Sequence, residues 1–175
     1  RFTRGWLDHA DAGSIHYEGR DRASLSAAER ANLRNRVMGF VFQDPNLLPL
    51  LTIAENVELP LLLNGWSARD ARDEALRRLD EIGLAGTAER RPAELSGGER
   101  QRAAVARALV GEPHVLWADE PTAELDAESA EPVLALFRRL HAEGRTIVVV
   151  THDERLAALA PRRVRMRAGR SSWVT

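Results

Sequence analysis

Three short apolar runs, separated by segments of helical spacing, constrain the fold of this chain more than any other feature. The runs are VMGFVFQ (37–43), HVLWAD (114–119) and RTIVVVTHD (145–153). Near-continuous apolar content over so few residues is typical of strands buried on both faces. The helices predicted around them span 27–36, 53–59, 67–84, 97–109 and 127–142. Strands that alternate with helices predict an α/β fold with a mostly parallel sheet.

Composition excludes several classes of protein. The 175 residues are 44% hydrophobic and 29% charged, which is enough apolar content to bury a core and enough charge for solubility. There is no cysteine, so neither disulfides nor cysteine-based metal sites are possible. A net charge of −1 offers no overall attraction to nucleic acid. No apolar run approaches the roughly 20 residues that span a bilayer.

The helix predicted after LSGG begins with two adjacent glycines, Gly97 and Gly98, although glycine costs a helix interior about 1 kcal/mol relative to alanine. Ser96 and Glu99 have the spacing of a capping box, which explains the serine and the glutamate but not the glycines. Glycines strip side chains from the first turn, where free N–H groups and the positive end of the helix dipole lie. Such a helix N-terminus binds phosphate readily. These residues alone leave both a plain cap and a phosphate site open.

Polar side chains follow each apolar run, where the predicted strands end. Asp119 and Glu120 follow one strand, His152 another and Gln43 the third. In open parallel sheets, ligands bind at the carboxyl ends of the strands. An aspartate there commonly holds Mg²⁺ beside nucleotide phosphates, and a neighbouring glutamate can act as a general base on water. Taken singly, Asp119 and Glu120 favour an acidic turn before Pro121, a histidine after a strand is usually structural, and Gln43 carries almost no signal. Together with the glycine-flanked helix, these residues indicate a phosphate site.

These segments, in this order and spacing, resemble the nucleotide-binding domain of ATP-binding cassette (ABC) transporters over essentially the whole chain. LSGGERQ (95–101) is similar to the family's signature motif and is the most specific of the matches. VLWADEPT (115–122) resembles the Walker B strand with its catalytic glutamate, AELD (123–126) the D-loop and VFQD (41–44) the Q-loop. His152 lies where the switch histidine is expected.

The resemblance implies a role for each matching residue. Ser96, Gly97 and Gly98, with Glu99 beside them, would bind the γ-phosphate of an ATP held mainly by the opposite subunit. Asp119 would support Mg²⁺, and Gln43 would sense the metal and the attacking water. Glu120 would be the catalytic base, His152 would contact the γ-phosphate, and Asp126 would lie at the dimer interface.

The resemblance also implies an organisation. It indicates one ABC ATPase domain over residues 1–175 of P-loop NTPase-like fold, with a helical, signature-bearing subdomain at approximately 45–110. The Q-loop neighbourhood is most similar to the lipoprotein-releasing and macrolide-export group of these ATPases. The implied ligands are ATP and Mg²⁺, and the implied partners are a membrane permease and a second ATPase subunit. We expect a peripheral location on the cytoplasmic face of the plasma (inner) membrane and no nucleic-acid partner.

The 175 residues contain no P-loop of the form G-x-x-x-x-G-K-S/T, and no lysine. Residues 1–19 resemble the segment that normally follows the P-loop helix, so we expect the chain to begin just after that loop. Two interpretations follow. The chain is a truncated part of an ordinary transport ATPase, or it is a degenerate subunit that only supplies its signature motif to a partner's ATP site. A P-loop encoded upstream would separate them.

Two other classes share some of these motifs. DNA-repair and chromosome-organising ATPases separate their motifs by long coiled coils, and no sustained heptads are present here. Translation-associated members carry two cassettes in one chain, which a length of 175 residues excludes unless much of the chain is missing. The basic segment RRVRMRAGR (162–170) is interpreted as a solvated edge strand rather than a lipid or nucleic-acid site.

Overall fold

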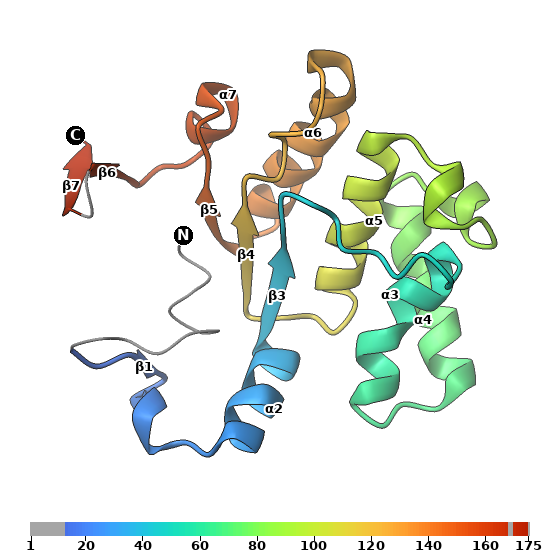
Figure 1. Ribbon diagram of the computed structural model, residues 1–175, viewed down its shortest axis with the longest axis horizontal. Coiled ribbons are helices and arrows are strands. Elements are labelled where there is room, and N and C mark those ends of the chain that lie inside the picture. Colours follow the sequence, from blue (N-terminus) through green and yellow to red (C-terminus); the bar gives the residue numbers. More distant parts are fainter. Residues whose placement is uncertain (1–12, 168–169, 175) are drawn as a thin grey trace.

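A three-stranded parallel sheet forms the centre of the computed structural model, which describes residues 13–167 and 170–174. The strands are β3 (Met38–Val41), β4 (Val115–Asp119) and β5 (Thr146–Val150), paired in the order β3-β4-β5. Val41 is in register with Ala118, and Ala118 with Val149. The carboxyl ends of all three strands therefore meet at one edge of the sheet, as Figure 1 shows for the arrowheads of β3 and β4. The predicted α/β fold with a parallel sheet is confirmed.

One face of this sheet is closely packed by helices. Val41, Leu116 and Ala118 are buried in a core shared with α5 (Gly97–Leu109) and α6 (Ala127–Ala142). The approach of α5 to β3 is close enough to require glycine at position 39, because a Cβ there would lie 2.3 Å from the carbonyl oxygen of Ala108. The tight helix–sheet contact fixes the signature-like helix directly against the strand that leads to Gln43.

Helices alone make up the layer beside the sheet. Here α3 (Ile53–Leu63) and α4 (Ala68–Glu81) pack on each other and on α5, with two short 3-10 turns, Ala85–Thr87 and Pro92–Glu94, between α4 and α5. The helix predicted at 67–84 is confirmed as α4, and its Ala71, Ala75 and Leu79, which recur every four residues, are fully buried. Gly83 follows the helix with φ of 73°, the left-handed conformation that favours glycine at a helix end. Figure 1 shows this layer on the α5 side of the sheet.

The remaining elements flank the sheet. Near the amino end, β1 (His16–Tyr17) and β2 (Arg20–Asp21) form a hairpin, and α2 (Ala27–Val37) leads into β3. After β5 come α7 (Glu154–Ala157) and an antiparallel pair, β6 (Arg163–Arg167) and β7 (Arg170–Val174). All side chains of β6 are exposed, which confirms the interpretation of the basic segment as a solvated strand; residues 168–169 lie outside the described chain. No described helix is both long and apolar enough to cross a membrane.

The structure differs from the sequence-based expectations in two element bounds and in the burial of one strand. The helix predicted at 53–59 continues to Leu63 through Pro60, because Leu61 in the last turn is buried at 1% exposure and anchors that turn in the core. The strand predicted at 37–43 is shorter, so Gln43 lies in the loop after β3. The strand at 145–153 was expected to be buried, but its Thr146 is exposed and the other side chains are half-buried. Within the described residues, β5 pairs with β4 alone and forms an edge of the sheet.

Candidate functional site

The residues predicted at the three strand ends lie along the same sheet edge. Asp119 is the last residue of β4, and Glu120 follows with its backbone N–H donating to the carbonyl of Val150 at 2.8 Å. His152 lies two residues beyond β5, and Gln43 lies two residues beyond β3. These residues lie along one edge because the parallel register brings equivalent positions of neighbouring strands side by side.

Glu120 and His152 are in direct contact. One Glu120 oxygen, Oε2, lies 2.9 Å from His152 Nδ1 and accepts a second hydrogen bond from the His152 backbone N–H at 3.2 Å. The hydrogen bond to Glu120, together with its negative charge, raises the pKa of His152 above the ordinary value. Glu120 itself has φ of 48°, an uncommon backbone conformation for a residue other than glycine. The Glu120 carboxylate at the end of β4 is thus held in one orientation by the side chain and the backbone N–H of His152.

Gln43 faces a different acidic side chain, that of Glu124. Gln43 Nε2 donates a hydrogen bond of 3.0 Å to Glu124 Oε1, across 81 residues of sequence. Both residues line a cleft of about 290 Å³ that also includes Gly97 and Gln101. The cleft therefore joins the loop after β3, the loop after β4 and the first turn of α5.

The capping box at the start of α5 is present. Ser96 Oγ accepts from the Glu99 backbone N–H at 3.2 Å, and Glu99 Oε2 accepts from the Ser96 N–H at 2.8 Å. These hydrogen bonds, first of all the one from the Ser96 backbone, lower the pKa of Glu99. Capping uses only an acceptor lone pair of the serine, so its O–H remains able to donate. Helix geometry also leaves the first N–H groups of α5 without intrahelical acceptors. A cap and a phosphate site are thus compatible at the N-terminus of α5, residues 96–99, which we call the helix mouth.

The two glycines of the helix mouth are not equivalent. A Cβ on Gly98 would lie 2.9 Å from the backbone oxygen of Ser129, so this buried glycine allows α5 to approach α6. A Cβ on Gly97 would meet only the end of the flexible Leu125 side chain, at 3.2 Å. Close packing is sufficient to explain Gly98, whereas Gly97 lines the cleft and keeps the helix mouth open.

Asp126 serves as the N-cap of α6. Its Oδ1 accepts from the Ser129 backbone N–H at 2.8 Å, and this bond is the main reason for its lowered pKa. Because Ser129 is also the residue that Gly98 contacts, Asp126 stabilises the surface on which the signature-like helix rests. The structure thus connects the D-loop-like segment to the mouth of α5.

The donor chemistry at the sheet edge suits magnesium. Asp119 supplies a carboxylate and Gln43 an amide oxygen, the hard oxygen ligands that Mg²⁺ prefers. Among the described residues no three carboxylate or histidine side chains gather as a metal cage. Mg²⁺ in nucleotide sites is held by one or two protein groups together with substrate phosphates, so this donor set fits.

Three residues of this neighbourhood were not identified from the sequence. Glu124 contacts Gln43, while Gln101 and Arg107 of α5 bind backbone carbonyls of the loop that carries Gln43. Gln101 lies within LSGGERQ, so the motif gave a signal for it. Glu124 likewise lies within AELD, but nothing in spacing or composition pointed to Arg107 or to the Gln43–Glu124 contact, because the partners are distant in sequence.

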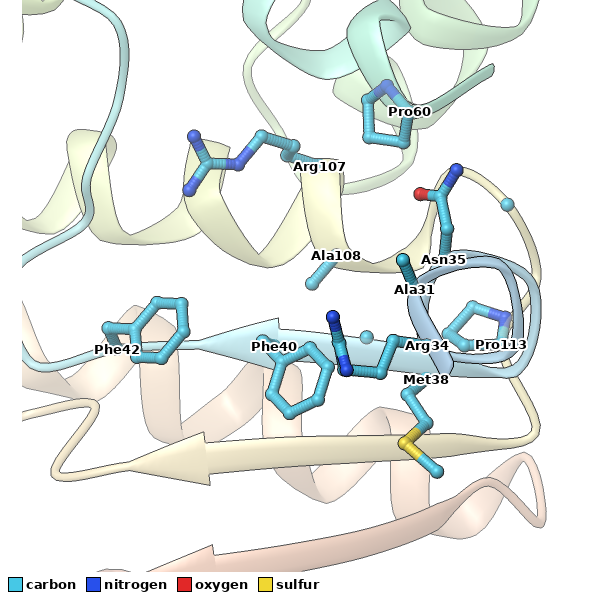
Figure 2. A pocket seen from close by; sticks show the side chains of 12 residues that line it. Ala31, Arg34, Asn35, Met38, Phe40, Phe42, Pro60, Arg107, Ala108 and Pro113 are labelled. Carbon is cyan, nitrogen blue, oxygen red and sulfur yellow. The ribbon is translucent and has the colours of Figure 1, made fainter. Parts of the chain in front are cut away.

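A second hollow has a volume of about 340 Å³, and Figure 2 shows the side chains that line it. It runs between α2, β3 and α5 and is mostly apolar, with Phe40 and Phe42 stacked 6.2 Å apart between ring centroids. It contains none of the predicted catalytic residues.

An open parallel sheet with carboxylate, histidine and glutamine side chains at its carboxyl edge, beside a glycine-flanked helix N-terminus, is typical of α/β proteins that bind phosphate-bearing ligands. The model of the ABC transporter family matches residues 6–123. The lipoprotein-releasing system ATP-binding protein LolD of Syntrophotalea carbinolica is 48% identical over 95% of this chain and 74% of its own length. The chain belongs to the ABC transporter family, as a transport-coupled ATPase.

Two further comparisons agree with this assignment. The macrolide export ATP-binding/permease protein MacB of Chlorobium luteolum is 46% identical over 94% of this chain, which spans 25% of that longer protein. Among solved structures, a dimeric post-hydrolysis state of the ATP-binding cassette MJ0796 with ADP and phosphate is similar, with a TM-score of 0.85. It is 37% identical and covers 97% of this chain, which covers 76% of that one. The predicted family and its lipoprotein-releasing and macrolide-export group are confirmed.

Proposed function

We propose that this chain is part of an ATPase subunit that dimerises beneath a membrane permease and powers lipoprotein release or the export of macrolide-type or lipid cargo. Support comes from the names of its relatives, LolD and MacB, and from the dimeric state of the similar cassette MJ0796. A permease partner in turn supports a peripheral position on the cytoplasmic face of the inner membrane.

In this proposal Glu120 is the general base. Its carboxylate takes a proton from the water that attacks the γ-phosphate. His152 holds this carboxylate in place through the 2.9 Å contact until the histidine side chain turns toward the phosphate. Gln43 would position the water from the neighbouring strand end. Asp119 and Gln43 would hold Mg²⁺, which supplies charge neutralisation on the phosphate oxygens.

The mouth of α5 would act on the ATP of the partner subunit. The Ser96 hydroxyl and the N–H groups of Gly97 and Gly98 would donate to its γ-phosphate, with Glu99 kept in the capping box. Asp126 would lie near the dimer interface, where its hydrogen bond to Ser129 supports the α5 mouth. Residues 45–110 would form the helical subdomain of one ATPase domain.

The observation that carries this proposal is the Glu120–His152 contact at the sheet edge. To test the proposal, light scattering measures whether the protein from the complete reading frame forms a dimer in the presence of Mg²⁺ and ATP. Glu120→Gln should accumulate as an ATP-bound dimer because hydrolysis no longer ends that state. Adding Gly97→Asp to Glu120→Gln should prevent the dimer, because a carboxylate at the helix mouth repels the γ-phosphate. A monomer in all variants would contradict the shared site.

The permease would contact exposed leucines near the Q-loop-like segment. Leu50 is 81% exposed in the loop before α3, and Leu63 is 71% exposed at the end of α3. Leu50→Ser with Leu63→Ser should reduce co-purification with a membrane permease encoded beside this protein. Leu76→Ser on α4 is the matched control, and an equal loss there would argue against this surface.

A further inference from the structure

Residues 42–46, which contain Gln43, are held by side chains of α5 from both ends. Gln101 Nε2 donates to the carbonyl of Phe42 at 3.0 Å. The guanidinium of Arg107 donates to the carbonyls of Pro45 and Asn46, each at 2.7 Å. Figure 2 shows Arg107 leaving α5 on the side of Phe42. One helix therefore supplies the donors for the loop carbonyls that precede and follow Gln43.

The contacts to Phe42 and Pro45 are partly buried, whereas the contact to Asn46 lies at the surface. Gln101 is buried, with 2% exposure, and burial lowers the pKa of Arg107. Backbone carbonyls are the acceptors of the Arg107 guanidinium, so loss of the side chain leaves two acceptors of the loop without a protein donor. The partly buried Pro45 carbonyl is the costlier of the two to leave unsatisfied, because the Asn46 carbonyl lies at an exposed position where water can replace the donor.

The loop between the two contacts has a specific shape. Asn46 has φ of 49°, and its N–H donates to the side chain of Asp44 at 3.2 Å. Gln101 and Arg107 are six residues apart, about 9 Å along the helix axis. Contacts separated by that distance resist rotation of the loop as well as translation.

We propose that Gln101 and Arg107 are positioning residues that fix Gln43 to the helix carrying Ser96, Gly97 and Gly98. The two parts of the site then move as one body, so that a displacement of residues 42–46 by a partner also displaces the helix mouth. This inference rests on the proposed function for its catalytic consequence.

The first test measures ATP turnover by the protein from the complete reading frame. Arg107→Met should lower kcat about 10- to 100-fold through misplacement of Gln43, with KM for ATP changed less than about twofold because the group does not touch nucleotide. Arg69→Met is the matched control, since it removes the same charge from an exposed position of α4. Arg107→Lys retains one cationic donor group and should recover part of the loss.

A double-mutant cycle separates positioning from general damage to the fold. If Arg107 acts through Gln43, Arg107→Met should have little further effect in a Gln43→Ala background. Additive losses in that background would overturn the proposal. Gln101→Glu, which removes the donor to Phe42 at nearly constant volume, should show the same dependence on Gln43.

Hydrogen exchange distinguishes failure of this inference from failure of the proposed function. Arg107→Met should speed amide exchange in residues 42–47 while exchange in the middle of α6 stays unchanged. This readout needs no ATP turnover, so it applies even if the wild-type protein does not hydrolyse ATP. Unchanged exchange in residues 42–47 would refute the clamp, whereas absent turnover with altered exchange would refute only the catalytic role.

Discussion

Ser96 illustrates how one side chain can satisfy a helix and remain available to a ligand. Its Oγ lone pair caps α5 by accepting from Glu99, while its O–H proton is free to donate. The structural and functional interpretations of the motif are therefore not alternatives. Substitutions at the glycines beside it separate the two requirements.

Gly98→Ala should destabilise the fold, because its Cβ would lie 2.9 Å from a backbone oxygen of α6 that cannot move cheaply. We expect a loss of about 1–3 kcal/mol, the usual cost of overpacking. Gly97→Ala meets only the Leu125 side chain and should change stability by less than about 0.5 kcal/mol. Urea unfolding of both variants makes the comparison; equal losses would contradict the assigned packing.

The Glu120–His152 contact predicts a pH-dependent histidine. Because Glu120 raises the pKa of His152, the contact stabilises the fold fully below the ordinary value of 6.5, and that stability is lost as pH rises through the raised pKa. NMR titration should place His152 above 6.5, and Glu120→Gln should return it toward 6.5. A pKa unaffected by Glu120→Gln would show that the pair does not form in solution.

At the scale of elements, α5 links the parts of the site. It packs on β3 and α6, its first turn forms the helix mouth, and Gln101 and Arg107 bind the loop after β3. Since β3 approaches α5 so closely at Gly39, small changes at this contact should affect the whole arrangement.

Gly39→Ala should destabilise the protein by about 3 kcal/mol, at the upper end for overpacking, because the added Cβ would overlap the Ala108 carbonyl at 2.3 Å. Gly86→Ala is the matched control, since open space surrounds that position. Thermal unfolding should show a large drop in Tm for Gly39→Ala alone. Equal Tm values for Gly39→Ala and Gly86→Ala would mean that β3 and α5 do not approach each other as closely as the 2.3 Å distance implies.

Elements were predictable from sequence where local patterns determine them. The period of Ala71, Ala75 and Leu79 gave α4, and Ser96 with Glu99 gave the start of α5, because both depend on neighbours within one helix. The half-exposed state of β5 was not predictable, because it depends on which strand lies beside it. The contacts of Arg107 and Glu124 join residues more than 60 positions apart, and no local pattern encodes them.

For the whole molecule, the parallel order of the strands does most to create the site. It delivers Gln43, Asp119, Glu120 and His152 to one edge from three places in the sequence, the ends of β3, β4 and β5. The sequence motifs identified these residues, while their contacts with Glu124 and with each other required the three-dimensional arrangement. In the proposed ATPase cycle, hydrolysis depends on Glu120 as the general base.

The most direct test is steady-state ATP turnover by the protein from the complete reading frame, compared between wild type, Glu120→Gln and Glu154→Gln. Glu154 is exposed on α7 and provides a matched carboxylate-to-amide control. We predict that Glu120→Gln loses at least about 100-fold in kcat, as expected for loss of a general base, while Glu154→Gln retains wild-type turnover. Comparable turnover by wild type and Glu120→Gln would contradict the role of Glu120 as the general base.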